Sequence, residues 1–147
     1  MLLGTVLSSN KTNILVMTGG CVAHLLLISL VNILMDFHNK TLNEAFLLVA
    51  LIPIPKFLHP KTKFHSILEA RLFHECLDFI LQPLKKAAQQ GVLMADSFGQ
   101  NHWCFTPLAS YIVDMPESAL ILGVGSKTSS VTTAFYQQFG DDFRHPP

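Results

Sequence analysis

The feature that most constrains this chain is a long stretch without a charged residue, which covers residues 13–35. A membrane-spanning helix needs about 20 consecutive apolar residues, so this stretch is long enough to cross a bilayer. It is interrupted by the Gly19-Gly20 pair and by scattered polar side chains. Glycine pairs are typical of turns, and they favour two buried strands, at 14–17 and 22–33, over one helix. A membrane span at 13–35 is the alternative.

The composition describes an apolar chain without a charge excess. Half of the 147 residues are apolar and 14% are charged, whereas about 25% are charged in an average soluble domain. Ten basic residues balance ten acidic ones, and proteins that grip DNA through its phosphates usually carry a positive excess. The length predicts a single domain over 1–140, followed by a flexible tail at 141–147. The neutral balance argues against tight, autonomous binding of nucleic acid.

A polar interval separates the first stretch from a second apolar run, at 42–54, which predicts a buried strand that ends at prolines. The clearest element is a helix over 66–90. Ser66 and Glu69 form a capping-box pattern at its start, apolar residues follow at helical spacing, and Gly91 is placed to end it.

The remainder of the chain predicts three further elements. The apolar run at 92–95 predicts a short buried strand that ends at Asp96, residues 102–115 are mixed and predict a helix after Pro107, and residues 119–125 predict another buried strand. Three strands in succession favour an opening antiparallel meander, and the long helix then crosses over to a parallel strand. The predicted class is α/β, with helices covering a mixed sheet.

Two polar groups follow apolar runs at positions where such a sheet can hold a ligand. Asn10 lies in the polar stretch LSSNKT, which is expected at an end of the first strand, and Asp96 follows the fourth. Ligands gather at strand ends in α/β sheets. If the first and fourth strands are neighbours, Asn10 and Asp96 face one another. An isolated aspartate after a strand is, however, more often a turn former or a helix cap.

Several stretches of the chain resemble, in order and spacing, the catalytic region of Plavaka-type transposases of the Kyakuja–Dileera–Zisupton DNA transposons. The resemblance covers residues 6–140. Its matching stretches are LSSNKT, HLLLISLVNI, LLVALIPIPKF, RLFHECLDFILQPLKKAAQQGVLMADSFG and TPLASYIVDMPESALILGVGSK.

The resemblance implies an RNase H-like fold and metal-dependent cleavage and transfer of DNA strands. The family places one acidic residue on its first strand, a second after its fourth strand and a third on a later helix. Together these acids hold two divalent cations, expected to be Mg²⁺. Asp96 matches the second acidic position, so the resemblance implies that it is a catalytic residue and a metal ligand. The resemblance also implies a nuclear protein that acts on DNA.

The chain departs from the family pattern at the other two acidic positions. Asn10 stands where the first aspartate is expected, and an amide oxygen brings no negative charge to hold a hard cation. The segment expected to carry the third acid is missing before Pro147. We therefore expect a degenerate transposase fragment without catalytic activity of its own. The alternatives are a membrane-associated protein and a non-catalytic module that binds a protein partner through exposed apolar surface.

Overall fold

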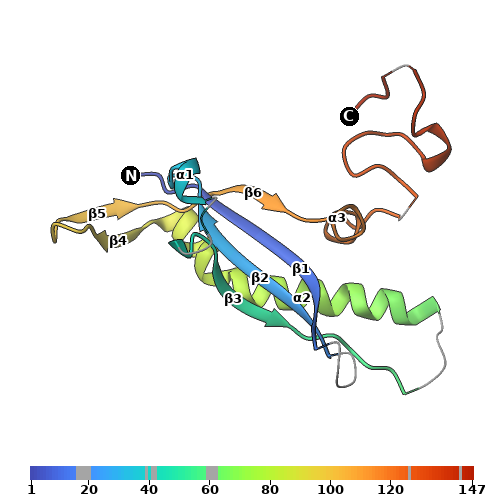
Figure 1. Ribbon diagram of the computed structural model, residues 1–147, viewed down its shortest axis with the longest axis horizontal. Coiled ribbons are helices and arrows are strands. Elements are labelled where there is room, and N and C mark those ends of the chain that lie inside the picture. The colour runs from blue at the N-terminus through green and yellow to red at the C-terminus, as the bar shows by residue number, and fades with distance from the viewer. Residues whose placement is uncertain (16–20, 39, 41–42, 59–62, 126, 143) are drawn as a thin grey trace. The chain divides into compact units, whose positions relative to one another are not determined.

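The computed structural model describes residues 1–147 except 16–20, 39, 41–42, 59–62, 126 and 143 (Figure 1). The described residues divide into two compact units, Met1–Ile112 and Val113–Pro147. The first unit contains the sheets and the long helix. The second contains a short helix and a single 3-10 turn at Tyr136–Gln138.

The first unit is built on a four-stranded mixed sheet. Its strands are β1 (Thr5–Leu15), β2 (Cys21–Leu30), β3 (Leu47–Ile52) and β6 (Leu108–Ile112), in the spatial order β3-β2-β1-β6. The pairs β1–β2 and β2–β3 are antiparallel, and β6 runs parallel to β1. This confirms the predicted mixed α/β class and the opening antiparallel meander. The strand predicted to run parallel after the long helix, at 92–95, is wrong, because it pairs antiparallel with residues 101–104 in a separate sheet, and β6 is the parallel strand instead.

One face of this sheet is buried, because side chains alternate between the two faces along each strand. On β1, Thr5, Leu7 and Ser9 are buried, whereas Val6 and Ser8 between them are half-buried. The register aligns this buried row of β1 with the corresponding row of β2. That buried face carries the core side chains of the sheet, which are Leu7, Leu26 and Ile52.

Helix α2 (Lys63–Gln90) covers the buried face (Figure 1). The ring of Phe73 stacks on the ring of His24 at a centroid distance of 5.0 Å, and Phe73 is buried. At the helix surface, Lys11 Nζ lies 3.5 Å from Glu69 Oε1, which ties β1 to α2. The core of this unit therefore lies between the sheet and α2.

The start of α2 differs from the prediction, whereas its end agrees with it. The helix begins at Lys63, so Ser66 lies inside the helix and the predicted capping role at its first residue is wrong. The helix ends at Gln90, and Gly91 has a φ of 75°. Glycine adopts this left-handed conformation without steric cost, which is why it terminates helices.

A separate two-stranded sheet follows α2. Strands β4 (Val92–Ala95) and β5 (Asn101–Cys104) form an antiparallel hairpin and pair with no strand of the larger sheet. The helix predicted after Pro107 is wrong, because residues 108–112 form strand β6 (Leu108–Ile112). Residues 108–112 form a strand because they pair with β1, where Leu108 lies opposite Thr5. Such a long-range contact cannot be predicted from local sequence.

The second unit contains α3 (Met115–Leu122) where the sequence predicted a strand at 119–125. Local signals explain the helix. Asp114 caps its first turn, a proline lies at its start, and Gly123 adopts a left-handed φ of 67° at its end. Near the end of the chain, the carbonyl of Pro146 accepts a hydrogen bond from the Thr133 amide at 2.8 Å.

The structure does not support a helix over residues 13–35. Residues 13–15 belong to β1 and residues 21–30 to β2, whereas the Gly19-Gly20 turn lies outside the described residues. A four-residue helix, α1 (Met35–His38), follows β2. Within the described part of the chain, no helix has both the length and the apolar character to cross a membrane.

Candidate functional site

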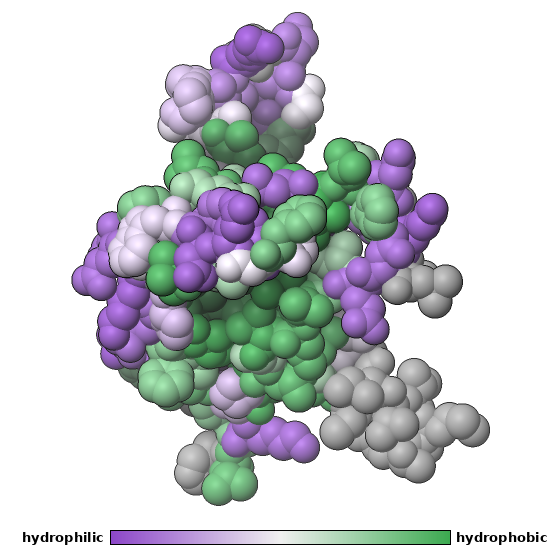
Figure 2. Space-filling model, turned by 90° about the vertical axis from the view of Figure 1, so that its left-hand side faces the viewer, coloured by the Kyte–Doolittle hydropathy of each residue, from purple (hydrophilic) through white to green (hydrophobic). Residues whose placement is uncertain are grey.

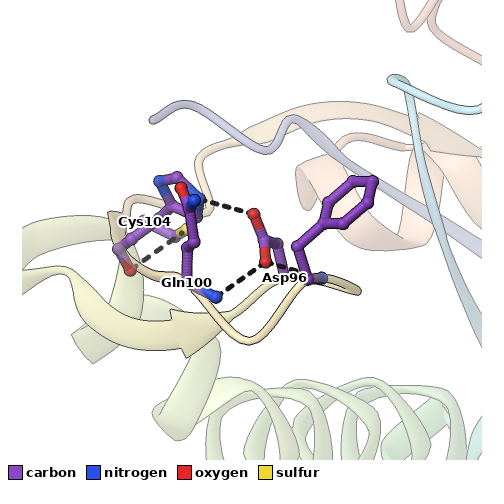
Figure 3. Close-up of polar contacts among 5 residues, drawn as sticks. Asp96, Gln100 and Cys104 are labelled. Carbon is purple, nitrogen blue, oxygen red and sulfur yellow. Dashed lines mark hydrogen bonds and ion pairs between the residues drawn. The ribbon is translucent and has the colours of Figure 1, made fainter.

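Asp96 lies in the turn of the β4–β5 hairpin, where its carboxylate holds the turn together (Figure 3). Its Oδ1 atom accepts hydrogen bonds from the backbone amides of Phe98 and Gln100, each at 2.9 Å. Its Oδ2 atom lies 2.9 Å from the Nε2 atom of His102 on β5. The Asp96 amide also donates to the Gln100 carbonyl at 2.9 Å. These contacts are typical of a turn-forming aspartate.

The electrostatics of Asp96 follow from these contacts. The hydrogen bond from His102 lowers the pKa of the Asp96 carboxyl, and the backbone amides of Gln100 and Phe98 lower it further. All three donors favour the ionised form, because each one donates a hydrogen bond from an N–H group to a carboxylate oxygen. Asp96 is therefore a carboxylate at neutral pH.

This arrangement limits what Asp96 can bind. An ionised carboxylate offers about four acceptor positions, and three of those of Asp96 are already used. The nearby thiol takes no part, because Cys104 Sγ donates to the carbonyl oxygen of His102 at 3.6 Å and not to its ring (Figure 3). A cation at Asp96 would compete with hydrogen bonds that the hairpin turn needs.

Asn10 lies within β1 and not after it, which corrects the predicted position of LSSNKT at a strand end. Asn10 pairs with Leu25 of β2 and its side chain is exposed. The preceding residue, Ser9, lies on the buried face, where Tyr111 Oη donates to Ser9 Oγ at 3.1 Å. Asn10 is therefore presented on the sheet face opposite to the one that α2 covers.

The predicted meeting of Asn10 and Asp96 is wrong. The neighbours of β1 are β2 and β6, whereas β4 pairs only with β5. Phe105, the residue that follows the hairpin, forms a bridge with Leu2, which lies just before β1. Since a strand rises about 3.3 Å per residue, Asn10 lies roughly 25 Å along the chain from Leu2. The assignment of Asn10 and Asp96 as catalytic residues, and of Asp96 as a metal ligand, stays a prediction.

Asp114 is the first acidic residue after β6, the last strand of the four-stranded sheet in chain order. Its Oδ1 atom accepts a hydrogen bond from the Glu117 amide at 3.0 Å, which caps α3. Later in the same unit, Asp141 Oδ2 lies 3.0 Å from His145 Nε2. Among the described residues, no group of three or more histidine, cysteine or acidic side chains is placed to hold a metal ion.

Sequence reasoning missed His102 as the partner of Asp96. The sequence predicts no strand at 101–104, whereas the β4–β5 hairpin brings the two residues together across six positions. A sequence signal for the hairpin is present, because Gly99 lies between two short runs that each contain apolar residues. Gly99 has a φ of 78°, which the turn requires.

The fold and these residues define a small mixed α/β domain, with a meander, a covering helix and a parallel fourth strand. The chain matches the family model described as Plavaka transposase over residues 1–147, and it belongs to that family. This confirms the resemblance found in the sequence. No match to this chain was found among curated proteins or among solved structures.

Proposed function

We propose that this chain is a remnant of a metal-dependent DNA transposase, with an RNase H-like fold, that no longer cleaves or transfers DNA by itself. The family membership over residues 1–147 carries the proposal of a transposase origin. The order of elements supports the fold: an antiparallel meander, a long helix and then a strand parallel to the first. That is the order expected of an RNase H-like sheet.

The proposed loss of activity rests on residue 10. The family pattern expects an acid on the first strand, and this chain carries the amide of Asn10 within β1. Catalysis by two cations requires anionic oxygens, which hold the metals close together against their mutual repulsion. An amide supplies an oxygen ligand without charge, so it weakens the site that the family pattern implies.

Magnesium titration by calorimetry tests these assignments. We expect Asn10→Asp to tighten Mg²⁺ binding about tenfold, because an added carboxylate raises the ligand charge. Asn101→Asp is the matched control, since it adds the same charge on an exposed residue of β5. In the Asn10→Asp background, Asp96→Asn then shows whether Asp96 contributes.

The outcomes separate the proposals. Loss of the added affinity with Asp96→Asn supports the assignment of Asp96 as a metal ligand, and retention of the added affinity contradicts it. Equal affinity of Asn10→Asp and Asn101→Asp rejects residue 10 as a metal position. Nicking of supercoiled plasmid by the unmodified chain with Mg²⁺ contradicts the proposed inactivity.

DNA in the nucleus is the partner that the family membership supports. The balance of ten basic and ten acidic residues predicts that this chain binds duplex DNA weakly on its own. Fluorescence anisotropy with a labelled duplex, repeated over a salt series, measures this directly. A dissociation constant below about 1 μM at physiological salt is tighter than typical non-specific binding and contradicts the expectation.

A further inference from the structure

Strand β3 (Leu47–Ile52) is the terminal strand of the four-stranded sheet (Figure 1). It pairs with β2 along one edge, and no described strand pairs with its other edge. The outer edge of a terminal strand presents a row of backbone amide and carbonyl groups, which is a template for a further strand. Natural proteins usually protect such an edge with charges, with proline or with a covering segment.

The side chains of β3 lack this protection. The segment LLVALI contains no charged residue and no proline, and its leucine and valine side chains are 40–58% exposed. Figure 2 shows that large apolar patches also lie at the surface of the molecule. Short segments with high β-propensity and no charge associate readily when their edges are exposed. The edge therefore suits an extended apolar strand.

The charges that flank β3 identify the partner and its direction. Over residues 43–56 the only charged residues are Glu44, before the strand, and Lys56, after it, and both are exposed. In an antiparallel pair of identical segments centred on Ala50, the flank that carries Glu44 lies opposite the flank that carries Lys56. A parallel pair would place like charges together, which is unfavourable.

We propose that β3 pairs antiparallel with β3 of a second copy of this chain, which joins the two sheets into one. Such an interface has two-fold symmetry, so each favourable charge contact occurs twice. The apolar side chains of β3 are self-complementary, because none of them carries a charge that would repel its copy. This inference rests on the edge of the sheet alone and does not depend on the proposed transposase ancestry.

Charge reversal tests the direction and the partner together. We expect the full chain to show a concentration-dependent dimer in sedimentation velocity. Glu44→Lys and Lys56→Glu should each weaken dimerisation about tenfold, since each reversal creates two like-charge contacts in a symmetric dimer. The double variant should restore the affinity of the unmodified chain. A chain that stays monomeric over the concentration series, or a double variant that is weaker than both single variants, overturns the proposal.

A second pair of variants tests which edge is used. Leu48→Lys places a charge on β3, and Leu108→Lys is the matched control on β6 at the opposite edge, with 57% and 53% exposure respectively. We expect only Leu48→Lys to abolish the dimer. The proposed β3–β3 pairing is overturned if the dimer is lost with Leu108→Lys alone or with both variants, and also if neither variant loses the dimer. Because both side chains are exposed, circular dichroism should show an unchanged fold in each variant.

Discussion

The Oδ2 atom of Asp96 lies 2.9 Å from the Nε2 atom of His102, so a carboxylate in the hairpin turn contacts an imidazole on the following strand. The other carboxylate oxygen accepts the amides of Phe98 and Gln100. One exposed side chain thereby supplies three of the contacts that hold the β4–β5 hairpin. The most distinctive acid in the sequence thus has a defined structural role, which the following variants measure.

Asp96→Asn should loosen the hairpin without unfolding the rest of the chain. The amide keeps one acceptor oxygen but loses the charge that strengthens all three hydrogen bonds. We expect the Phe98 and Gln100 amides to exchange with solvent roughly five- to tenfold faster, as measured by hydrogen exchange. Asp78→Asn is the control, because it removes an exposed carboxylate paired with Lys85 on α2. Unchanged exchange in the hairpin would contradict the assigned role of Asp96.

Acid should release the same contacts. The pKa of Asp96 is lowered in the folded hairpin, first by His102 and then by the backbone amides. The carboxylate therefore stabilises the hairpin fully above the ordinary aspartate pKa of about 3.9, and this stabilisation is lost as the pH falls through the lowered value. Trp103, the single tryptophan, lies on β5 and reports the change by its fluorescence. We expect the Trp103 fluorescence of the unmodified chain to change as the pH falls, and we expect no such change in Asp96→Asn. The same change in both proteins would show that another group causes it.

Three elements of the first unit, β2, β3 and α2, could be predicted from local sequence. The uncharged stretch with its glycine pair predicts β2 but only the end of β1, because the predicted first strand at 14–17 overlaps β1 at residues 14 and 15. The 3.6-residue spacing before Gly91 predicts α2. The strand after the hairpin, β6, could not be predicted in this way. The segment LASYI of β6 has no clear alternation, and it is a strand because it pairs with β1 about a hundred positions earlier. Such a contact is not visible in a local window.

The site was predicted less well than the fold, for a related reason. The sequence identified Asp96 as the end of an apolar run, and a turn role was among its interpretations. Its proposed partner depended on strand order, and an inserted hairpin changed that order, so Asn10 lies on the four-stranded sheet and Asp96 lies in the turn of the separate β4–β5 hairpin. Asp114 lies in a sequence context that is typical of a helix start. The apolar run at 119–125 nevertheless predicts a strand, because a short apolar run is compatible with a strand or a helix.

Gly91→Ala should destabilise the chain more than Gly99→Ala. Both glycines have similar left-handed φ values, 75° and 78°, so both substitutions carry the same backbone strain of about 1 kcal/mol. A methyl group at Gly91 would also collide with the indole of Trp103, including Cδ1 at 2.9 Å, whereas nothing lies within 4 Å at Gly99. Overpacking adds roughly 1–3 kcal/mol, measured as the difference in unfolding free energy in urea. Equal losses would show that the indole moves away freely.

Leu26→Ala should be among the most destabilising single substitutions, because Leu26 is 0% exposed on the central strand β2. Its partners in register, Ser9 on β1 and Ala50 on β3, are both small, so neither can fill the space that the leucine leaves. Removing a buried leucine typically costs 2–5 kcal/mol, and the upper half of that range is expected where neighbours cannot close the cavity. Urea unfolding followed by circular dichroism measures the loss. Leu58→Ala, at 98% exposure, is the matched control and should change stability by less than about 0.5 kcal/mol. A similar loss in both variants would contradict a core between the sheet and α2.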